Sequence, residues 1–466
     1  MSMFQDLGLS DAIVYPALNT NTSLDMATGA FELGANNKYY LNGGLPPFFG
    51  IGGRGGYYKS TVLEGILAFC LHNYPGSMAF KLDTESNALL PKARMKKTLL
   101  YAYGDDCDVE GILDRLRVNN LASMGSKEFE ETIIKICEYK EKNKKSQMVE
   151  SPFLDRNGEK IKMWIPTFIC VDSLTMLSFT DEVNKSENLS VEDKSKNMDA
   201  LRDGLLKKRL LTNWSRLAYK YGLYFMMSAQ VDDTFIADEY NKPIKQNQYT
   251  GNSDRFKGVG PMFEFLTNTL LQNFSPAPLV SAADRKSPEY SIDGSGLVEI
   301  NEITTKLLRC KSSPAGTTIP MLASQNYGVL PGLSYYHYLK KSDDFGFNVS
   351  GVGRTNRYCM LAPDTLLKRQ TVLESLKNNY ELNRALEIMY QLKWMIDCWS
   401  KTGLPFDLPK TAEEFVERVV GGGDLTISDI VNSRGYWTYE HESATEDLKR
   451  PYMSIFDILS IINIKK

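Results

Sequence analysis

The sequence predicts an α/β protein with a mainly parallel sheet, a short N-terminal arm and a mostly helical C-terminal domain. Three observations predict this class. Apolar strand-like segments alternate with helical ones, polar residues follow several of these strands, and a glycine-rich turn joins the first strand to a helix. Strands that alternate with helices are typical of a parallel sheet. The 466 residues therefore divide into an arm (1–40), a core (41–335) and a C-terminal domain (336–466).

The elements of the core are expected in the following order. Residues 47–51 form the first strand, and the apolar segment 60–73 forms the helix that follows it. Further strands are expected at 77–82, 98–103, 167–171 and 223–228, and further helices at 128–141 and 198–221. Two long polar segments, 180–197 and 231–260, interrupt the alternation. Loops of this length inside a domain are usually functional or disordered.

The composition narrows the class of protein. Its 54 Lys+Arg and 57 Asp+Glu give a net charge of −3, which excludes a polycationic DNA coat but leaves room for a local basic groove. We expect no signal peptide and no membrane span. The seven cysteines form no C-x-x-C pair and the three histidines lie far apart, which argues against a zinc site and favours reduced thiols in the cytoplasm.

The glycine-rich turn is the central motif. It consists of Gly53, Arg54, Gly55, Gly56, Tyr57, Tyr58, Lys59, Ser60 and Thr61. The motif fits the phosphate loop G-x-x-x-x-G-K-[ST] except that Tyr58 occupies the last glycine position. In such a loop, backbone N–H groups and a helix N-terminus bind phosphate, the lysine reaches the β- and γ-phosphates, and the hydroxyl binds Mg²⁺. Taken alone, the segment also fits a surface turn.

Polar residues at the ends of three expected strands favour the phosphate-loop interpretation. Asp172 follows 167–171, Glu85 follows 77–82 by a few residues, and Gln230 follows 223–228. Ligands of parallel sheets bind at these carboxyl ends. Asp172 would hold Mg²⁺, Glu85 would orient the attacking water, and Gln230 would sense the γ-phosphate. Each residue alone also fits a strand-end cap, but together with the loop they favour an ATPase that uses ATP and Mg²⁺.

This combination resembles the RecA/UvsX recombinases, which are P-loop ATPases with a RecA-like core. The phage UvsX type also has an aromatic residue in place of the last loop glycine. The resemblance covers about residues 41–335, roughly two thirds of the chain, and departs from the family in lacking an aromatic residue for adenine stacking at 86–95. The segments that carry it are 41–46, 53–61, 83–85, 169–174, Gln230, 258–262 and 309–312.

The resemblance implies roles for particular residues. Lys59, Ser60, Asp172 and Glu85 correspond to the ATPase residues, and Gln230 corresponds to the allosteric sensor. Arg309 and Lys311 resemble the basic residues that reach ATP from the neighbouring subunit, and the arm would dock onto that subunit.

The resemblance also implies a function. The protein would be a DNA-dependent ATPase that forms helical filaments on single-stranded DNA. It would pair this DNA with homologous duplex DNA and exchange strands in recombination, repair and replication. Single-strand-binding and loader proteins would be further partners. The protein would work in the host cytoplasm or in a phage replication compartment.

The resemblance implies DNA contacts in two loops that include the long polar segments, at about 178–197 and 231–260. The second segment contains Lys242, Lys245, Arg255 and Lys257, interleaved with aromatic residues that include Phe256. Proteins that bind single strands combine cations along the backbone with aromatic side chains that contact bases. By composition alone, a solvated loop fits this segment equally well.

Two alternative functions remain open. One is a ring-forming RecA-fold helicase with Arg309 as its arginine finger, although no separate primase-binding or hairpin domain is evident in the sequence. The other is a recombination mediator that hydrolyses ATP poorly, and the presence of Lys59, Glu85 and Asp172 argues against it.

Overall fold

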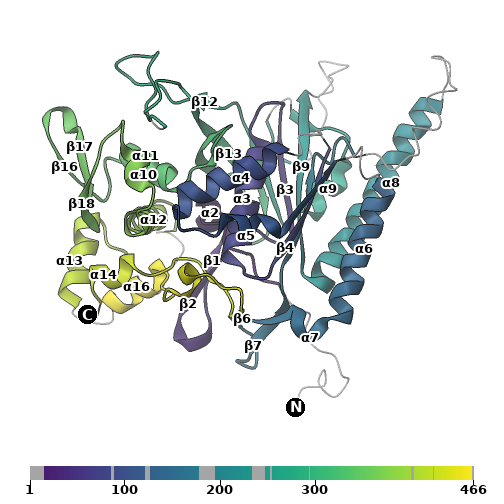
Figure 1. Cartoon of the computed structure of the whole chain (residues 1–466), viewed down its shortest axis with the longest axis horizontal. Coiled ribbons are helices and arrows are strands. Elements are labelled where there is room, and N and C mark those ends of the chain that lie inside the picture. The colour runs from purple at the N-terminus through teal and green to yellow at the C-terminus, as the bar shows by residue number, and fades with distance from the viewer. Residues whose placement is uncertain are drawn as a thin grey trace.

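A large, mainly parallel sheet forms the centre of the molecule, and helices lie on both of its faces (Figure 1). The computed structural model describes residues 15–84, 89–120, 126–177, 195–233, 247–251, 254–292, 294–399, 404–422 and 425–463. In this part of the chain the mixed α/β class predicted from the sequence is confirmed.

The sheet is parallel on one side and antiparallel on the other. The strands from β11 to β5 are parallel, while β13, β14 and β15 continue the sheet in antiparallel pairs beyond β11. The order across the sheet is β15 (Gly328–Val329), β14 (Thr318–Ser324), β13 (Ile300–Cys310), β11 (Thr269–Asn273), β3 (Phe48–Gly53), β9 (Leu223–Asp233), β8 (Thr167–Asp172), β4 (Met78–Asp83) and β5 (Leu116–Asn120). The short strands β10 (Asp254–Phe256) and β12 (Ala277–Pro278) pair with β9 and β13.

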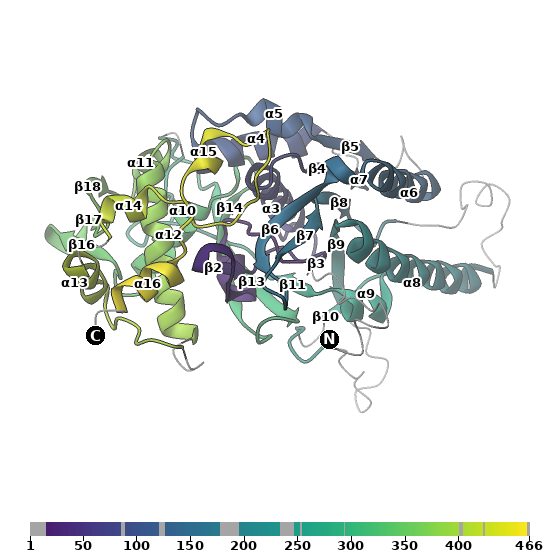
Figure 2. The same cartoon turned by 90° about the horizontal axis from the view of Figure 1, so that it is seen from below.

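Alternate residues of the central strands enter two different cores. In β9, Tyr224 and Met226 belong to one cluster of buried side chains, and Phe225 and Met227 belong to the other. A strand buried on both faces is expected to be apolar throughout, which explains the continuous apolar runs in the sequence. Helices α3 (Lys59–Asn73), α4 (Leu89–Tyr103) and α5 (Val109–Asp114) cover one face, and α6 (Ser126–Lys142), α8 (Ser195–Tyr221) and α9 (Gly260–Leu266) cover the other (Figure 2).

The described part of the expected arm packs against its own chain. Leu18 and Leu24 are fully buried, and the Asn19 N–H donates a hydrogen bond to the hydroxyl of Tyr74, 2.7 Å away. This region contains α2 (Ser23–Thr28), β1 (Ala30–Leu33), a 3₁₀ turn (Ala35–Asn37) and β2 (Tyr39–Asn42), and it lies near the hairpin of β6 (Met148–Leu154) and β7 (Lys160–Trp164), which follows the short α7 (Lys144–Gln147). Docking of the arm onto a neighbouring subunit stays a prediction.

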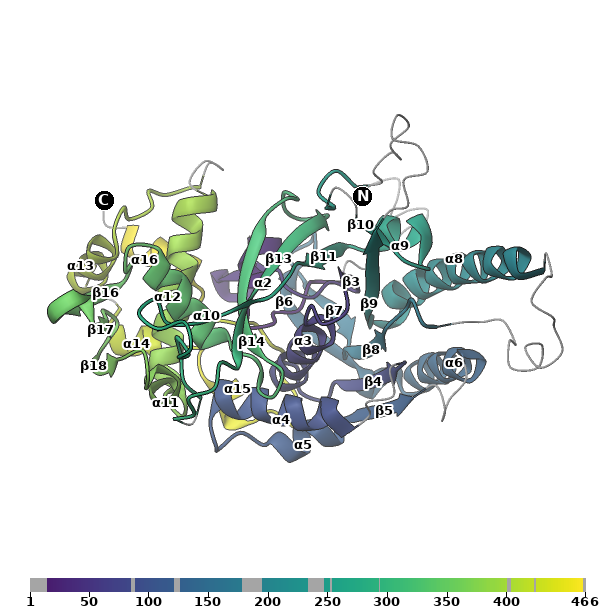
Figure 3. The same cartoon turned by 90° about the horizontal axis from the view of Figure 1, so that it is seen from above.

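The C-terminal region lies at one end of the molecule, opposite α6 and α8 (Figure 3). It shares the larger core cluster with the sheet, and Trp437 packs against Tyr74. The expected boundary at 335/336 falls inside α10 (Pro331–Lys341). A small sheet follows, with β16 (Phe347–Ser350), a 3₁₀ turn (Val352–Arg354), β17 (Asn356–Cys359) and β18 (Ala362–Leu367). The remaining elements are α11 (Val372–Leu376), α12 (Tyr380–Trp394), a π-helical turn (Met395–Trp399), α13 (Ala412–Gly422), α14 (Ile427–Val431), α15 (Glu446–Lys449) and α16 (Ile455–Asn463).

Most of the expected core elements are confirmed, and one is wrong. Strands β3, β4, β8 and β9 and helices α3, α6 and α8 form where the pattern predicts them. Residues 98–103, expected as a strand, are instead the last turns of α4. Met95 and Leu99, four residues apart, are both fully buried on one face of that helix. When an apolar run is this short, its periodicity alone cannot distinguish a helical segment from a strand.

Candidate functional site

The carboxyl ends of four neighbouring parallel strands bring several of the predicted site residues to one edge of the sheet. Gly53 at the end of β3 is paired in register with Gln230 of β9, and Asp172 at the end of β8 is paired with Asp83 of β4. Side chains from segments far apart in the sequence can therefore act on one ligand at this edge.

The glycine-rich turn connects β3 to α3 at this edge. Gly56 has a φ of 76°, in the left-handed region that glycine adopts without steric cost. A Cβ atom added to Gly55 or Gly56 would meet no described atom within 4 Å, so this part of the loop borders open space. The first N–H groups of a 15-residue helix point toward the same place, because they have no carbonyl partner one turn earlier in the helix.

Tyr58 also adopts the left-handed conformation, with φ 59° and ψ 20°. This backbone geometry explains why glycine is the usual residue here, since a side chain costs about 1–2 kcal/mol in this region. Tyr58 offsets the cost with its ring, which is 8% exposed, and its hydroxyl accepts a hydrogen bond from the Asn301 side-chain amide at 2.7 Å. Burying a tyrosine ring contributes roughly 4 kcal/mol.

Lys59 and Arg54 provide positive charge at the loop. The Lys59 ammonium donates a hydrogen bond to the Arg54 carbonyl oxygen at 2.8 Å, so it lies over the loop. The Arg54 guanidinium pairs with Asp233 at 2.6 Å and with Asp254 at 3.0 Å. These carboxylates belong to the paired strands β9 and β10, so Arg54 links the loop to that hairpin.

Ser60 and Asp172, the two predicted magnesium ligands, are in direct contact. The Ser60 hydroxyl donates a hydrogen bond to Asp172 Oδ1 at 2.9 Å, and the Ser228 hydroxyl donates to the same oxygen at 2.9 Å. Because its proton is directed to Asp172, the lone pairs of the Ser60 oxygen are available to a cation. Asp172 is 4% exposed. Burial by itself would raise the pKa of its carboxyl group, but Lys81 and the two hydroxyl groups lower that pKa below its usual value.

Lys81 is a site residue that the sequence analysis did not single out. Its ammonium lies 3.1 Å from Asp172 Oδ2 and 2.5 Å from Glu64 Oε1, and it is only 1% exposed. Burial disfavours its charge, yet Asp172 and Glu64 raise its pKa above the usual value. Glu64 in turn pairs with Arg94 at 2.9 Å. A lysine within the apolar strand sequence MAFKLD was the available signal, because a lysine is rarely buried without a charged partner.

Gln230 lies beside the loop, as predicted. Its backbone N–H donates a hydrogen bond to the Thr175 hydroxyl at 2.9 Å, and its carbonyl oxygen accepts a hydrogen bond from the Lys257 N–H at 2.9 Å. Gln230 is therefore hydrogen-bonded to Thr175, which follows β8, and to Lys257, which follows β10.

Only some of the predicted DNA and catalytic residues fall in the described part of the chain. Glu85, Lys242 and Lys245 lie outside the described residues. Arg255 is exposed, and Lys257 is exposed and pairs with Asp232 at 3.1 Å. Phe256 is 5% exposed and packs against Phe263, so in this conformation its ring belongs to the core. Its role in binding DNA stays a prediction.

Arg309 and Lys311 lie toward the opposite edge of the sheet. Arg309 is aligned with Leu270 of β11, which is aligned with Gly50 of β3, three residues before Gly53. At about 3.3 Å per residue, this places Arg309 roughly 10 Å from the loop along the strand direction alone. The Arg309 guanidinium donates to the Glu264 carbonyl oxygen at 2.7 Å. Arg309 and Lys311 therefore lie near each other, but away from the glycine-rich turn and Asp172 of the same chain.

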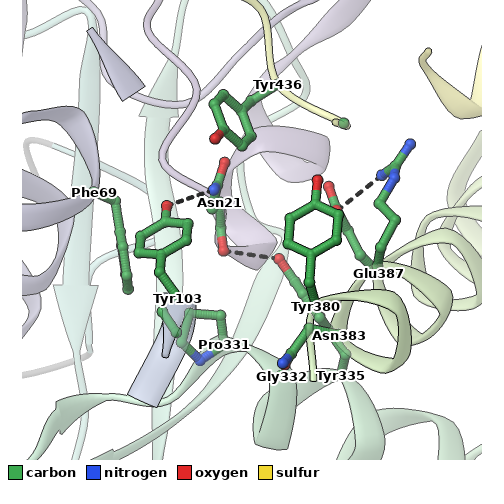
Figure 4. Close-up of a pocket in the computed structure, with 13 residues that line it drawn as sticks. Asn21, Phe69, Tyr103, Pro331, Gly332, Tyr335, Tyr380, Asn383, Glu387 and Tyr436 are labelled. Atoms are coloured by element: carbon green, nitrogen blue, oxygen red, sulfur yellow. Dashed lines mark hydrogen bonds and ion pairs between the residues drawn. The ribbon is translucent and has the colours of Figure 1, made fainter. Parts of the chain in front are cut away.

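A separate cavity lies where the N-terminal segment, α3, α4 and the C-terminal region meet. Figure 4 shows Asn21 in the wall of this cavity. The side-chain amide of Asn21 donates a hydrogen bond to the Tyr103 hydroxyl, and its backbone carbonyl oxygen accepts one from the Tyr335 hydroxyl. Its volume of about 60 Å³ leaves room for a few water molecules. None of the glycine-rich turn residues line it, so it is distinct from the candidate site.

The residues at the sheet edge fit a magnesium nucleotide. The open loop and the helix N-terminus suit phosphate, and the Ser60–Asp172 pair suits a hard cation. Within the described ranges, no three His, Cys, Asp or Glu side chains gather as metal ligands. Mg²⁺ commonly binds through one or two protein ligands together with substrate phosphates, so this site would need the nucleotide to complete it.

No protein-family model matches the chain, and no curated protein matches its sequence. Among the helices of the described residues, none combines the length and the apolar character that crossing a membrane requires.

Proposed function

We propose that this protein is a DNA-dependent ATPase of the RecA/UvsX recombinase type, which binds ATP with Mg²⁺ at the carboxyl edge of the sheet. The observation that carries the proposal is the Ser60–Asp172 hydrogen bond of 2.9 Å, beside a glycine-rich turn that opens α3. A phosphate loop followed by a hydroxyl, with a buried acid at the end of another strand of the same sheet, is the arrangement that binds a magnesium nucleotide.

Each residue has a role in this proposal. The N–H groups at the start of α3 bind phosphate oxygens, and Lys59 exchanges its carbonyl partner for the β- and γ-phosphates. Ser60 and Asp172 hold the cation, which when bound neutralises charge that develops on the phosphate oxygens. Glu85, which directly follows Thr84 in the chain, orients the attacking water.

The DNA-binding part of the proposal rests on the resemblance and on the position of two chain segments. Residues 178–194 follow β8, and residues 234–246 follow β9, so both leave neighbouring strands at the edge that holds the loop. Gln230 is adjacent to the loop and precedes the second segment, which makes it the proposed link between nucleotide and DNA.

The position of Arg309 and Lys311 supports a site completed by another subunit. These residues lie toward the edge of the sheet opposite the nucleotide edge of their own chain, so they would reach ATP only across a subunit boundary. A head-to-tail contact between subunits produces a helical filament when the assembly does not close on itself, and a ring when it does.

Two experiments test the proposal. The first measures binding of a fluorescent ATP analogue with Mg²⁺, and absence of binding would refute the nucleotide site. The second is electron microscopy of the protein with single-stranded DNA and a non-hydrolysable ATP analogue. Helical filaments support the recombinase, whereas closed rings would favour a RecA-fold helicase.

A further inference from the structure

Lys81 is an unusual residue in the middle of the sheet. It lies on β4 between Phe80 and Leu82, whose side chains enter the core under α6 and α8, so Lys81 faces α3 on the opposite side. At 1% exposure its ammonium depends on protein partners. Replacing Lys81 together with its acidic partners by apolar residues of similar volume would be neutral or stabilising, because buried ion pairs rarely outweigh their desolvation, whereas removing Lys81 alone would leave two buried carboxylates unpaired. Stability therefore does not explain a lysine at this position.

The two carboxylate oxygens of Asp172 have different binding partners. Lys81 binds Oδ2 at 3.1 Å, and Ser60 and Ser228 bind Oδ1, each at 2.9 Å. The torsion that rotates a carboxylate has broad minima, so these contacts determine which oxygen faces the phosphate loop. Of the three, the Lys81 contact alone restrains Oδ2.

We propose that Lys81 is a positioning residue for the magnesium site, which holds Asp172 so that Oδ1 and Ser60 together receive the cation. The inference rests on the proposed function, since it assigns Lys81 a role in the same nucleotide site. Lys81 touches neither nucleotide nor cation and acts through Asp172.

Glu64 and Arg94 keep Lys81 in place. The Lys81 ammonium lies 2.5 Å from Glu64 Oε1, and the Arg94 guanidinium lies 2.9 Å from Glu64 Oε2. Arg94 also donates to the Thr61 hydroxyl at 3.0 Å and to the Gln325 carbonyl oxygen at 2.9 Å. The four charges alternate in sign from Asp172 to Arg94, so the position of Lys81 is determined from both sides.

The test compares how much Mg²⁺ strengthens nucleotide binding in matched variants. Glu64→Gln removes one charge but leaves an amide oxygen that can accept from Lys81, so the contact between Lys81 and Asp172 remains. The double variant E64Q/K81M removes the contact and one charge of each sign. The dissociation constant of a fluorescent, non-hydrolysable ATP analogue is measured in EDTA and in Mg²⁺ for the wild type and both variants.

We expect the three proteins to bind the analogue within about twofold of one another in EDTA, because Lys59 and the loop are unchanged. We expect Mg²⁺ to strengthen binding by the same factor in the wild type and E64Q, and by a factor about tenfold smaller in E64Q/K81M. A tenfold change equals about 1.4 kcal/mol, close to the lower end of the range for one hydrogen bond to a charged group. A lysine that served packing alone would not change the effect of Mg²⁺ selectively.

Other outcomes would overturn the inference. An equal Mg²⁺ effect in E64Q and E64Q/K81M would show that Lys81 does not position Asp172, and a larger effect in the double variant would show that Lys81 opposes the cation. A wild-type protein that binds no analogue would refute the proposed function itself. If E64Q/K81M does not fold, E64Q/K81Q replaces the ion pair with two amides, and the same comparison with E64Q applies.

Discussion

Substitution of Lys59 by alanine tests the phosphate loop most directly. In the structure its ammonium lies over the loop and donates to the Arg54 carbonyl oxygen at 2.8 Å. This position lets it move to a phosphate without a change in the backbone. A hydrogen bond to a charged group is worth about 1.5–3 kcal/mol, so the loss of Lys59 should weaken ATP binding about 10- to 150-fold.

The assay is titration of a fluorescent ATP analogue in Mg²⁺, together with steady-state ATP hydrolysis. Lys96→Ala is the matched control, because Lys96 is an exposed lysine on α4 that pairs with Glu110. The control removes the same charge and should bind ATP as the wild type does. Urea unfolding should show that Lys59→Ala changes the free energy of unfolding by about 1 kcal/mol or less, the value of one hydrogen bond. Equal affinity in Lys59→Ala and the control would refute the phosphate-loop assignment.

Four further predictions test the remaining parts of the site and the core. Glu85→Gln keeps the shape of the side chain but removes the base, so ATP hydrolysis should fall while ATP-dependent DNA binding persists; wild-type rates would contradict the role. Alanine at Lys242, Lys245, Arg255 and Lys257 together should reduce the slope of log affinity for single-stranded DNA against log salt by up to about 3, and an unchanged slope would move the DNA site elsewhere. Tyr58→Gly should relieve the left-handed backbone but lose the buried ring, which lowers the free energy of unfolding by about 3 kcal/mol in urea titrations. Burial lowers the pKa of the Lys140 ammonium to about 7, against about 10.4 in the unfolded chain, so between these pH values only the unfolded state holds the proton. Stability of the wild type relative to Lys140→Met should therefore rise with pH, by about 1.2 kcal/mol per unit between pH 8 and 10, and a constant difference would contradict this.

The expected elements were accurate where periodicity and length agreed. Helix α3 and strand β8 form within a residue or two of the predicted ends, because a long apolar helix and a short buried strand have different sequence patterns. The prediction of a strand at 98–103 was wrong because periodicity and length did not both identify the element. It is short and apolar, and its helical state depends on the preceding turns of α4 and on the packing of Leu99.

Several features of the site could not be predicted from local patterns. The ion pairs of Arg54 join the loop to Asp233 and Asp254, roughly 180 and 200 positions away along the chain. The burial of Phe256 follows from the pairing of β10 with β9, which brings its ring over Gly52. Lys81 had a visible signal, a charge in an apolar strand, but its partners belong to β8 and α3.

The sequence by itself determined the α/β class, the position of the glycine-rich turn before α3, and the polar residues at the ends of β8 and β9. These features depend on neighbours along the chain, through side-chain periodicity and the conformational preferences of glycine. Only the tertiary structure decided the order of the strands, and with it the contact of Ser60 with Asp172 and the separation of Arg309 from the loop. Strand order depends on which apolar faces bury each other across the whole chain, and no local pattern contains that information.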